Sequence, residues 1–290
     1  MPDIFLLKSI FGDFMFVAIN MKKIKKVSFF LVAAAVVIAA GKGVFNKKSI
    51  LTMADGNTKG YLAIIIDDFG YNGEGTEEML ALDIPFTAAV MPFSSNTDED
   101  IAKIKEAGKD YIIHMPMESL TGKREWVGEK GVFVDMTDEA IKSAVRDAFD
   151  KVDGASGMNN HMGSAVMEDE RCLSAVIDEV AARGGVFVDS VTTSKSLGEK
   201  VCAEKGVDIF KRDVFLDSTD DSEVVCGNIE KAGKIAIENG FAIAIGHVGP
   251  EGGFVTANAI KSMYPKLMGQ GVEFVTISRL SELVAEKRDY

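Results

Sequence analysis

The chain has 290 residues, of which 47% are hydrophobic and 26% are charged, and its formal net charge is −12. This composition is typical of a globular protein with a substantial core, and it excludes a collagen-like or disordered chain. The negative charge argues against nucleic-acid binding, which requires a basic surface for the phosphates. Three cysteines are too few for a disulfide framework.

The N-terminal segment differs in charge from the rest of the chain. Residues 1–59 contain nine basic and three acidic residues, a net of +6, whereas the remainder contains 23 basic and 41 acidic residues, a net of −18. Four lysines between positions 22 and 26 directly precede an apolar run at 27–40. This order is typical of an export signal or a short membrane anchor, with an ordinary buried helix as the alternative.

These patterns predict three parts of the chain. Residues 1–42 are a signal peptide or membrane anchor, residues 43–59 are a polar linker, and residues 60–290 form the globular domain. Met21 begins a stretch that has the features of a signal by itself, so we hypothesise that translation starts there and that residues 1–20 are a start-site extension. The protein is then exported to an extracytoplasmic or periplasmic location and contacts the membrane only through its N-terminal segment.

From residue 61 onward, short apolar runs alternate with segments of helical spacing. Runs that are apolar on both faces predict buried parallel strands covered by helices. The predicted strands lie at 62–66, 86–91, 111–113, 186–188, 209–210, 241–245 and 272–277, and the clearest helices lie at 98–107, 170–183 and 222–239.

This alternation predicts an α/β fold, an irregular (β/α) barrel of seven or eight strands, with an open doubly wound sheet as the alternative. Residues 119–136 are the least regular stretch and are predicted to be a loop that carries the only tryptophan, Trp126. The three cysteines fall inside predicted helices, where they are expected to be small buried hydrophobic residues.

Ionisable side chains follow the predicted strands, where α/β proteins place their chemistry. Asp67 and Asp68 come directly after the run at 62–66, and a turn there would bring both carboxylates to the rim of the barrel. His114 follows the run at 111–113, and Pro116 is expected to end that strand. His161 lies in a polar cluster at 159–164, between glycines, which is expected to be a rim loop close to a ligand.

Three further strand ends have the same form. Asp189 follows the run at 186–188, Arg212 and Asp213 follow the run at 209–210, and His247 follows the run at 241–245. All three histidines of the chain therefore lie at predicted strand ends.

A carboxylate and two imidazoles form an ordinary three-ligand set for Zn²⁺ or a similar divalent ion. A second carboxylate could take a proton from water, a separate protonated imidazole could donate one to a leaving group, and an Asp–Arg pair could orient either. The chain contains no Gly-x-Ser-x-Gly motif and no phosphate-binding glycine loop after a strand. The inventory favours metal-assisted hydrolysis of an amide or ester.

Taken together, these motifs resemble those of the divergent polysaccharide deacetylase family. The resemblance covers residues 61–284, and its motifs are Ile-Asp-Asp-Phe-Gly (66–70), His-Met-Pro-Met-Glu (114–118), Asn-Asn-His-Met-Gly-Ser (159–164), Val-Asp-Ser (188–190), Arg-Asp-Val-Phe-Leu-Asp (212–217) and Ile-Gly-His (245–247). That family is similar in fold to the NodB-like carbohydrate esterases. The resemblance implies a divalent metal, usually zinc, and removal of acetyl groups from glycans such as chitin or peptidoglycan.

The resemblance also implies roles for individual residues. Asp67 matches the catalytic base, and Asp68 and His114 match two metal ligands. Glu118 stands where the wider superfamily has a second histidine. Either Glu118 replaces that ligand or His161 from the next motif completes the set, and we favour His161.

In the same comparison, His247 resembles the late histidine that acts as general acid. Asp189, Arg212 and Asp213 are its expected orienting partners.

Three functions remain open on the sequence alone. The first is a metal-dependent deacetylase acting on an envelope polysaccharide or amino-sugar glycan. The second is a metal hydrolase of another amide, ester or phosphate. The third is a catalytically silent envelope protein that binds glycan.

Overall fold

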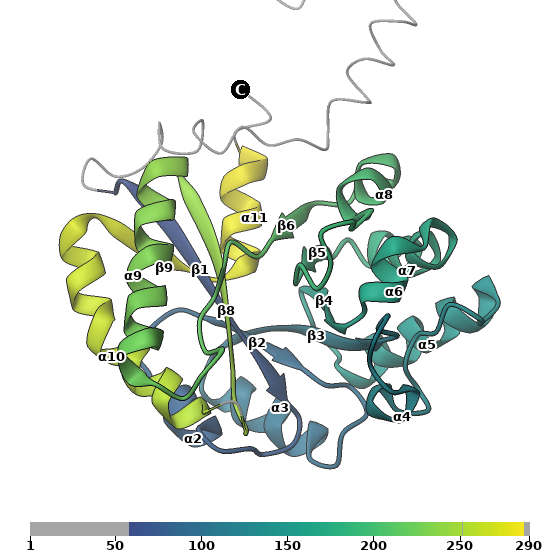
Figure 1. The fold of residues 1–290 in the computed structure, drawn as a ribbon, viewed down its shortest axis with the longest axis horizontal. Coiled ribbons are helices and arrows are strands. Elements are labelled where there is room, and N and C mark those ends of the chain that lie inside the picture. The colour runs from purple at the N-terminus through teal and green to yellow at the C-terminus, as the bar shows by residue number, and fades with distance from the viewer. Residues whose placement is uncertain (1–57, 251, 287–290) are drawn as a thin grey trace, which may run out of the picture. The chain divides into compact units, whose positions relative to one another are not determined.

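The computed structural model describes residues 58–250 and 252–286 of the chain (Figure 1). The predicted signal or anchor segment, the start at Met21 and nearly all of the predicted linker lie outside these residues and stay predictions. Within the described ranges, no helix has both the length and the apolar character needed to cross a bilayer.

In the described part of the chain, nine strands form one sheet in which all paired neighbours are parallel. Their order is β6-β5-β4-β3-β2-β1-β8-β7, and β9 pairs with the N-terminal part of β1. No ladder among these residues joins β6 to β7, so the curled sheet is open there. The strands are β1 (Gly60–Phe69), β2 (Thr87–Val90), β3 (Asp110–Met117), β4 (Gly157–Met162), β5 (Val186–Asp189), β6 (Ile209–Lys211), β7 (Val214–Phe215), β8 (Phe241–His247) and β9 (Val272–Val275).

Helices follow most strands and lie around the sheet (Figure 1). The three predicted helices are confirmed as α3, α7 and α9, each within one residue at either end. Asp169 and Asp221 cap α7 and α9 with their side chains, which explains where these two helices begin. The helices are α2 (Thr76–Leu80), α3 (Thr97–Glu106), α4 (Arg124–Val127), α5 (Asp138–Lys151), α6 (Ser164–Glu168), α7 (Glu170–Ala182), α8 (Gly198–Lys205), α9 (Ser222–Asn239), α10 (Gly253–Gln270) and α11 (Ile277–Glu286).

The two faces of the sheet belong to two separate hydrophobic clusters. On β1, Leu62 and Ile64 pack in the outer cluster with residues of α3, α5, α7, α9 and α10. Ala63 and Ile65 point the other way, into an inner cluster made by strands and by α11. Because α11 is the only helix of the inner cluster, it fills the end of the barrel at which β1 begins.

This distribution confirms the predicted irregular barrel and excludes the doubly wound alternative for the described residues. A doubly wound sheet carries helices on both faces, whereas here they cover the outer face and one end. The eight-strand path agrees with the predicted number of strands, and β9 adds a short ninth strand beside β1. Cys172 and Cys202 are fully buried in α7 and α8 as expected, whereas Cys226 in α9 is only partly buried, so the expectation is wrong for that residue.

Two local predictions are wrong. Residues 159–162 are not a loop but the last four residues of β4. His114 lies within β3 rather than at its end, because Pro116 continues the strand. Pro116 is tolerated because β2 has already ended at this level, opposite Ile113. Beyond that point the edge of β3 faces Val132, whose N–H group donates a hydrogen bond to the Pro116 carbonyl oxygen at 2.9 Å. The missing N–H group therefore interrupts no ladder.

Candidate functional site

A β-bulge in β1 brings two adjacent carboxylates to the same place. The β1–β2 register advances three residues on β1, from Ile66 to Phe69, against two on β2. Asp68 supplies the extra residue and adopts a left-handed φ of 68°. Without the bulge, Asp67 and Asp68 would point to opposite faces of the sheet. The turn expected from the sequence is thus a bulge inside the strand.

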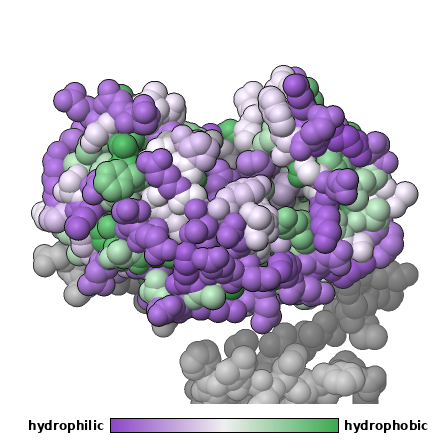
Figure 2. All heavy atoms as spheres, turned by 90° about the horizontal axis from the view of Figure 1, so that it is seen from below, coloured by the Kyte–Doolittle hydropathy of each residue, from purple (hydrophilic) through white to green (hydrophobic). Residues whose placement is uncertain are grey.

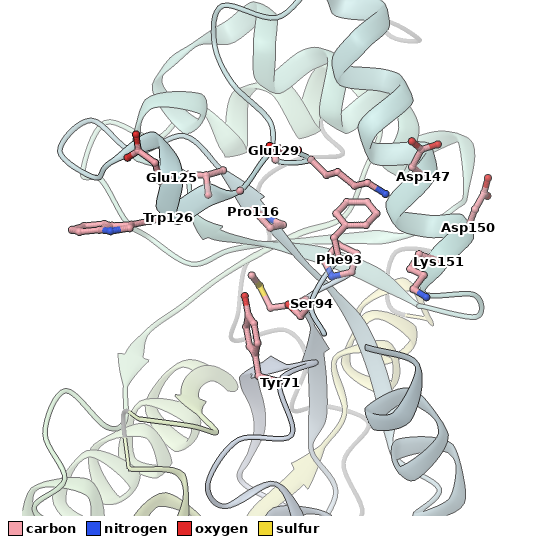
Figure 3. A pocket seen from close by; sticks show the side chains of 16 residues that line it. Tyr71, Phe93, Ser94, Pro116, Glu125, Trp126, Glu129, Asp147, Asp150 and Lys151 are labelled. Atoms are coloured by element: carbon pink, nitrogen blue, oxygen red, sulfur yellow. The ribbon is translucent and has the colours of Figure 1, made fainter. Parts of the chain in front are cut away.

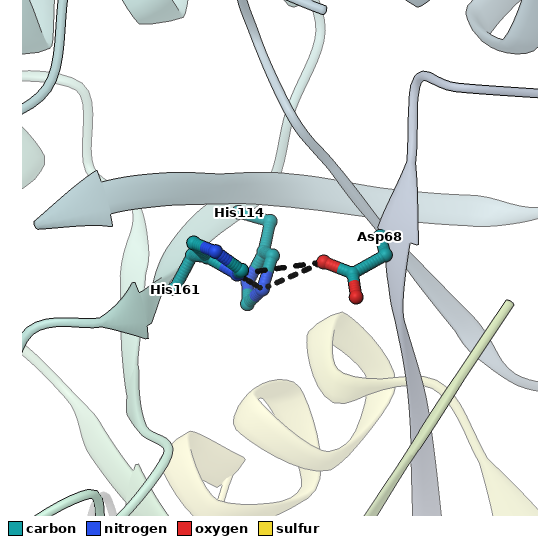
Figure 4. Close-up of side chains that lie close together, drawn as sticks. All are labelled: Asp68, His114 and His161. Carbon is teal, nitrogen blue, oxygen red and sulfur yellow. Dashed lines mark hydrogen bonds and ion pairs between the residues drawn. The ribbon is translucent and has the colours of Figure 1, made fainter. Parts of the chain in front are cut away.

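Asp68 meets two imidazoles from β3 and β4 (Figure 4). Its Oδ1 atom lies 3.4 Å from His114 Nε2 and 3.4 Å from His161 Nδ1. The two imidazole nitrogens are 3.0 Å apart. In the parallel β3–β4 register Pro116 is opposite His161, so the two imidazoles come from positions that are two residues apart along the sheet.

These three ligand atoms fit a divalent metal ion. Zn–N and Zn–O bonds of about 2.0–2.2 Å in a tetrahedron place ligand atoms about 3.3–3.6 Å apart. The observed separations of 3.0, 3.4 and 3.4 Å are close to that spacing. Asp68 Oδ1 is buried and has no geometrically acceptable hydrogen-bond partner, which is costly unless a cation or proton satisfies it. Asp68, His114 and His161 can therefore hold one ion.

The protonation of Asp68 also suits a ligand. Burial alone would raise the pKa of its carboxyl group, but the imidazoles of His114 and His161 more than offset this and hold the pKa well below its usual range. For His114, burial lowers the pKa, and the charges of Asp67 and Asp68 raise it above its ordinary value. The cluster thus holds an anionic oxygen against two imidazoles.

Asn159 connects this cluster to Asp67. Its Oδ1 atom lies 2.7 Å from His114 Nδ1, and its Nδ2 group donates to Asp67 Oδ1 at 2.8 Å. An amide oxygen only accepts hydrogen bonds, so His114 Nδ1 carries the proton and Nε2 keeps its lone pair for a metal. Asp67 is 2% exposed, and burial raises the pKa of its carboxyl group against the opposing charges of His114 and His247. Asp67 is therefore the candidate base of the site.

His247 ends β8, directly beside Asp67 in the β1–β8 register. Its Nδ1 atom is 2.9 Å from Asp217 Oδ1, and the other oxygen of Asp217 accepts from the His247 backbone N–H at 2.6 Å and from Thr256 Oγ1 at 2.8 Å. Burial lowers the pKa of the imidazole, but the hydrogen bond to Asp217 and the charge of Asp67 raise it to about 9. A protonated His247 can therefore act as an acid at neutral pH.

Asp217 is a candidate functional residue to which the sequence analysis gave no role, although it ends the motif at 212–217. It follows the apolar residues 214–216 and so obeys the same rule as the other strand ends, but β7 has only two residues and was not among the predicted strands. Phe215 of β7 packs its ring 4.8 Å from the His247 ring, centroid to centroid.

The three residues expected to orient His247 have other hydrogen-bond partners. Asp189 accepts from Val191 N–H at 2.7 Å and from Ser196 Oγ at 2.6 Å, on the side of α8. Asp213 accepts from the backbone N–H of Ile243 at 2.9 Å. The hydrogen bond that orients His247 thus comes from Asp217 rather than from Asp189 or Asp213.

The Arg212 side chain donates hydrogen bonds to the backbone just after β5. Its Nε donates to Ser190 O at 2.7 Å and its Nη2 donates to Val191 O at 3.1 Å. Burial lowers the pKa of the guanidinium group, and the charges of Asp189 and Asp67 oppose that shift. The charge of Asp67, the candidate base, therefore reaches the Arg212 guanidinium group, although the two residues share no hydrogen bond.

Glu118 lies outside the ligand cluster. Its Oε2 atom accepts from Val134 N–H at 2.8 Å, and its backbone carbonyl accepts from Ala165 N–H at 3.0 Å. Glu118 therefore holds the predicted loop at 119–136 against the barrel, and His161, not Glu118, is the third residue of the candidate cluster.

A groove of about 850 Å³ is lined by the loop that carries α4, by residues that follow β2 and by α5, and none of the three candidate ligands lines it (Figure 3). Pro116 forms part of its wall and lies on the same face of β3 as His114, two residues nearer the end of the strand. Tyr71, Phe93 and Trp126 also line it, and the Trp126 side chain is 61% exposed. The face toward which β1 and β8 run is mainly hydrophilic, with separate hydrophobic patches (Figure 2).

Comparison with known proteins matches most of this chain to one family. A family model described as divergent polysaccharide deacetylase matches residues 64–281. The chain is 31% identical over 202 residues to the uncharacterized protein YibQ of Escherichia coli, and 32% identical over 189 residues to an uncharacterized protein of Haemophilus influenzae. These matches cover 70% and 65% of this chain, and 63% and 67% of the relatives' own lengths.

A solved structure has the same fold. It is that of an uncharacterized protein from Agrobacterium tumefaciens, with a TM-score of 0.71, 18% identity, and coverage of 83% of this chain and 96% of the other. The family match spans most of the barrel and every strand-end residue described above. The chain therefore belongs to the divergent polysaccharide deacetylase family.

Proposed function

We propose that this protein is a divalent-metal-dependent deacetylase of an envelope polysaccharide or amino-sugar glycan. The observation that carries the proposal is that the ligand atoms of Asp68, His114 and His161 are spaced almost as in a tetrahedral metal site. Asp67 and the protonated imidazole of His247 stand opposite each other on the neighbouring strands β1 and β8. A set of two imidazoles and one carboxylate favours zinc and leaves positions open for water and substrate. Export through the N-terminal segment would place the protein next to such glycans.

The residues around the cluster supply the two proton transfers of hydrolysis. A bound divalent ion would polarise the acyl carbonyl group and make water more acidic. Asp67 takes a proton from the attacking water as the water oxygen bonds to the acyl carbon. His247 then gives its Nε2 proton to the leaving nitrogen or oxygen as the bond to the acyl carbon breaks. The products are acetate and a free amine or hydroxyl group on the sugar.

The groove supports a polymeric rather than a small substrate. Its volume of about 850 Å³ is near the upper end of the range for small-ligand pockets, and it is open to solvent. Tyr71, Phe93 and Trp126 offer flat apolar surfaces of the kind on which sugar rings stack. The charged residues that line the groove have both signs, with the acidic side chains of Glu125, Glu129, Asp147 and Asp150 and the basic side chains of Lys130 and Lys151. A neutral or mixed-charge polymer therefore fits better than a polyanion.

The proposal is tested by acetate release from a panel of acetylated glycans. We expect zinc-loaded protein to release acetate from at least one N- or O-acetylated glycan, chelation to abolish release, and added zinc to restore it. Non-carbohydrate amides and esters in the same panel test the wider metal-hydrolase alternative. Glycan binding without acetate release by fully loaded protein would contradict the proposal and favour the catalytically silent alternative.

Trp126→Ala is expected to weaken the use of polymer without affecting chemistry. Its exposed indole lies in the groove and not in the metal cluster, so KM for a glycan polymer should rise about tenfold, equivalent to about 1.4 kcal/mol, with kcat unchanged. Hydrolysis of a small acetyl ester should not change. Phe254→Ala is the matched control, because Phe254 is 48% exposed and does not line this groove. An unchanged KM for the polymer in Trp126→Ala would place the groove outside the substrate path.

A further inference from the structure

Ser190 is a buried serine whose hydroxyl group has no partner. The residue is 8% exposed, and its Oγ atom is buried without a hydrogen bond. A buried hydroxyl group without a partner destabilises a folded protein, so such groups call for a specific explanation. Neither the metal cluster nor the two proton transfers described above uses it.

The alternation of β5 directs this hydroxyl group toward the inside of the barrel. Val186 and Val188 belong to the inner cluster, and Phe187 belongs to the outer one. Asp189 then points outward, since its Oδ2 bonds Ser196 and lies 3.2 Å from where a Cβ on Gly198 of α8 would stand. The next residue, Ser190, therefore faces inward.

The neighbouring strand, β4, carries the candidate metal ligand His161. The parallel β4–β5 ladder ends with Asn159 opposite Val188, and the same register continued by two residues would bring His161 level with Ser190. Residues opposite each other on paired strands point to the same face of the sheet. The Ser190 N–H group donates to Asn160 Oδ1 at 2.9 Å, so a side chain of β4 holds the residue that follows β5.

The backbone of Ser190 is held on both sides. Asn160 binds its N–H group, and Arg212 Nε binds its carbonyl oxygen at 2.7 Å. The next residue, Val191, has a φ of 53°, which is unfavourable for a β-branched side chain. Asp189 Oδ1 and Arg212 Nη2 bind Val191 and maintain that conformation. Two polar side chains thus hold Ser190 rigidly while its hydroxyl group stays available for a ligand.

We propose that the Ser190 hydroxyl group donates a hydrogen bond to an oxygen of the acyl group bound at the active site, which is the substrate carbonyl oxygen or a carboxylate oxygen of the acetate product. This inference rests on the proposed function, because it assigns an acyl ligand to the same site. Ser190 is a binding residue in this assignment, and it takes no part in proton transfer. The positive charge of Arg212 next to it favours an oxygen that carries negative charge.

The test compares Ser190→Ala with wild type and with Ser156→Ala. Ser156 stands at the start of β4, at the opposite end of the barrel, and its hydroxyl group bonds Asp110 and Tyr111 O at 3.2 Å each. Acetate is the probe, and its affinity for the zinc-loaded proteins is measured by NMR. We expect Ser190→Ala to weaken acetate binding about tenfold, the effect of losing one hydrogen bond to a charged group, with zinc content unchanged. Ser156→Ala should leave acetate affinity as in wild type.

Thermal unfolding of the metal-free proteins gives a second, independent measurement. Because Ser190 Oγ has no internal partner, Ser190→Ala should leave the Tm unchanged or raise it, whereas Ser156→Ala should lower it. Unchanged acetate affinity, or a lower Tm for Ser190→Ala, would overturn the assignment. Neither measurement needs turnover, so a protein that binds acetate through Ser190 but releases none from glycans would refute the proposed function alone.

Discussion

Asp68→Asn is expected to remove both the metal and the activity, whereas Asp67→Asn removes the activity alone. An amide is a weak metal ligand, and Asp68 supplies the only carboxylate of the three-ligand set. Asp67 instead accepts a hydrogen bond from Asn159 and does not belong to the set, so its amide variant should bind zinc as wild type does. Loss of the base should lower kcat by about 10²–10⁴-fold.

Zinc content, zinc affinity and acetate release measure the two effects separately. Burial raises the pKa of Asp67, so its ionised form disfavours the folded state, and the neutral asparagine should leave the metal-free protein equally or more stable at pH 7. Asp135→Asn is the control for charge removal, because Asp135 is an exposed carboxylate paired with Arg124. Zinc loss in both Asp67→Asn and Asp68→Asn would refute the division of roles between the two carboxylates.

The barrel was predictable because its strands are apolar on both faces. Successive residues of β1 pack alternately into the outer cluster (Leu62, Ile64) and the inner cluster (Ala63, Ile65). The strand is therefore a continuous apolar run in the sequence. The same reasoning fails for β4, whose inner face toward its end is turned to the candidate site rather than to the core. There Asn159 and His161 replace the apolar residues, so hydropathy predicts a loop where the ladder continues.

The candidate ligands could be located from the sequence, but their arrangement could not. The rule that ionisable side chains follow strands identifies Asp68 and His114, yet it does not reveal the bulge that turns Asp68 toward the imidazoles. Nor does spacing identify Asp217, which lies 30 residues before His247 and reaches it only because β7 pairs with β8. Side-chain partners of this kind depend on strand register, which local sequence does not specify.

His247 and Asp217 should control the alkaline side of the pH–activity profile. His247→Gln removes the proposed acid and should lower kcat by about 10²–10⁴-fold. In wild type the imidazole is protonated below its pKa of about 9, so activity should fall as the pH rises through that value. Asp217→Asn keeps the imidazole but removes its charged partner, so this limb should move at least about one unit toward acid pH.

The same pair predicts how stability depends on pH. The folded-state pKa of His247 lies above the ordinary value of 6.5, so protonation stabilises the folded state. That contribution is complete below about pH 6.5 and is lost as the pH rises through about 9, and Asp217→Asn should reduce it. Asp178→Asn is the matched control, since Asp178 pairs with Lys142 and Lys205 on the surface. The two variants are compared by kcat and by urea unfolding between pH 6 and 10. The same pH dependence of both quantities in Asp217→Asn and Asp178→Asn would contradict this role for Asp217.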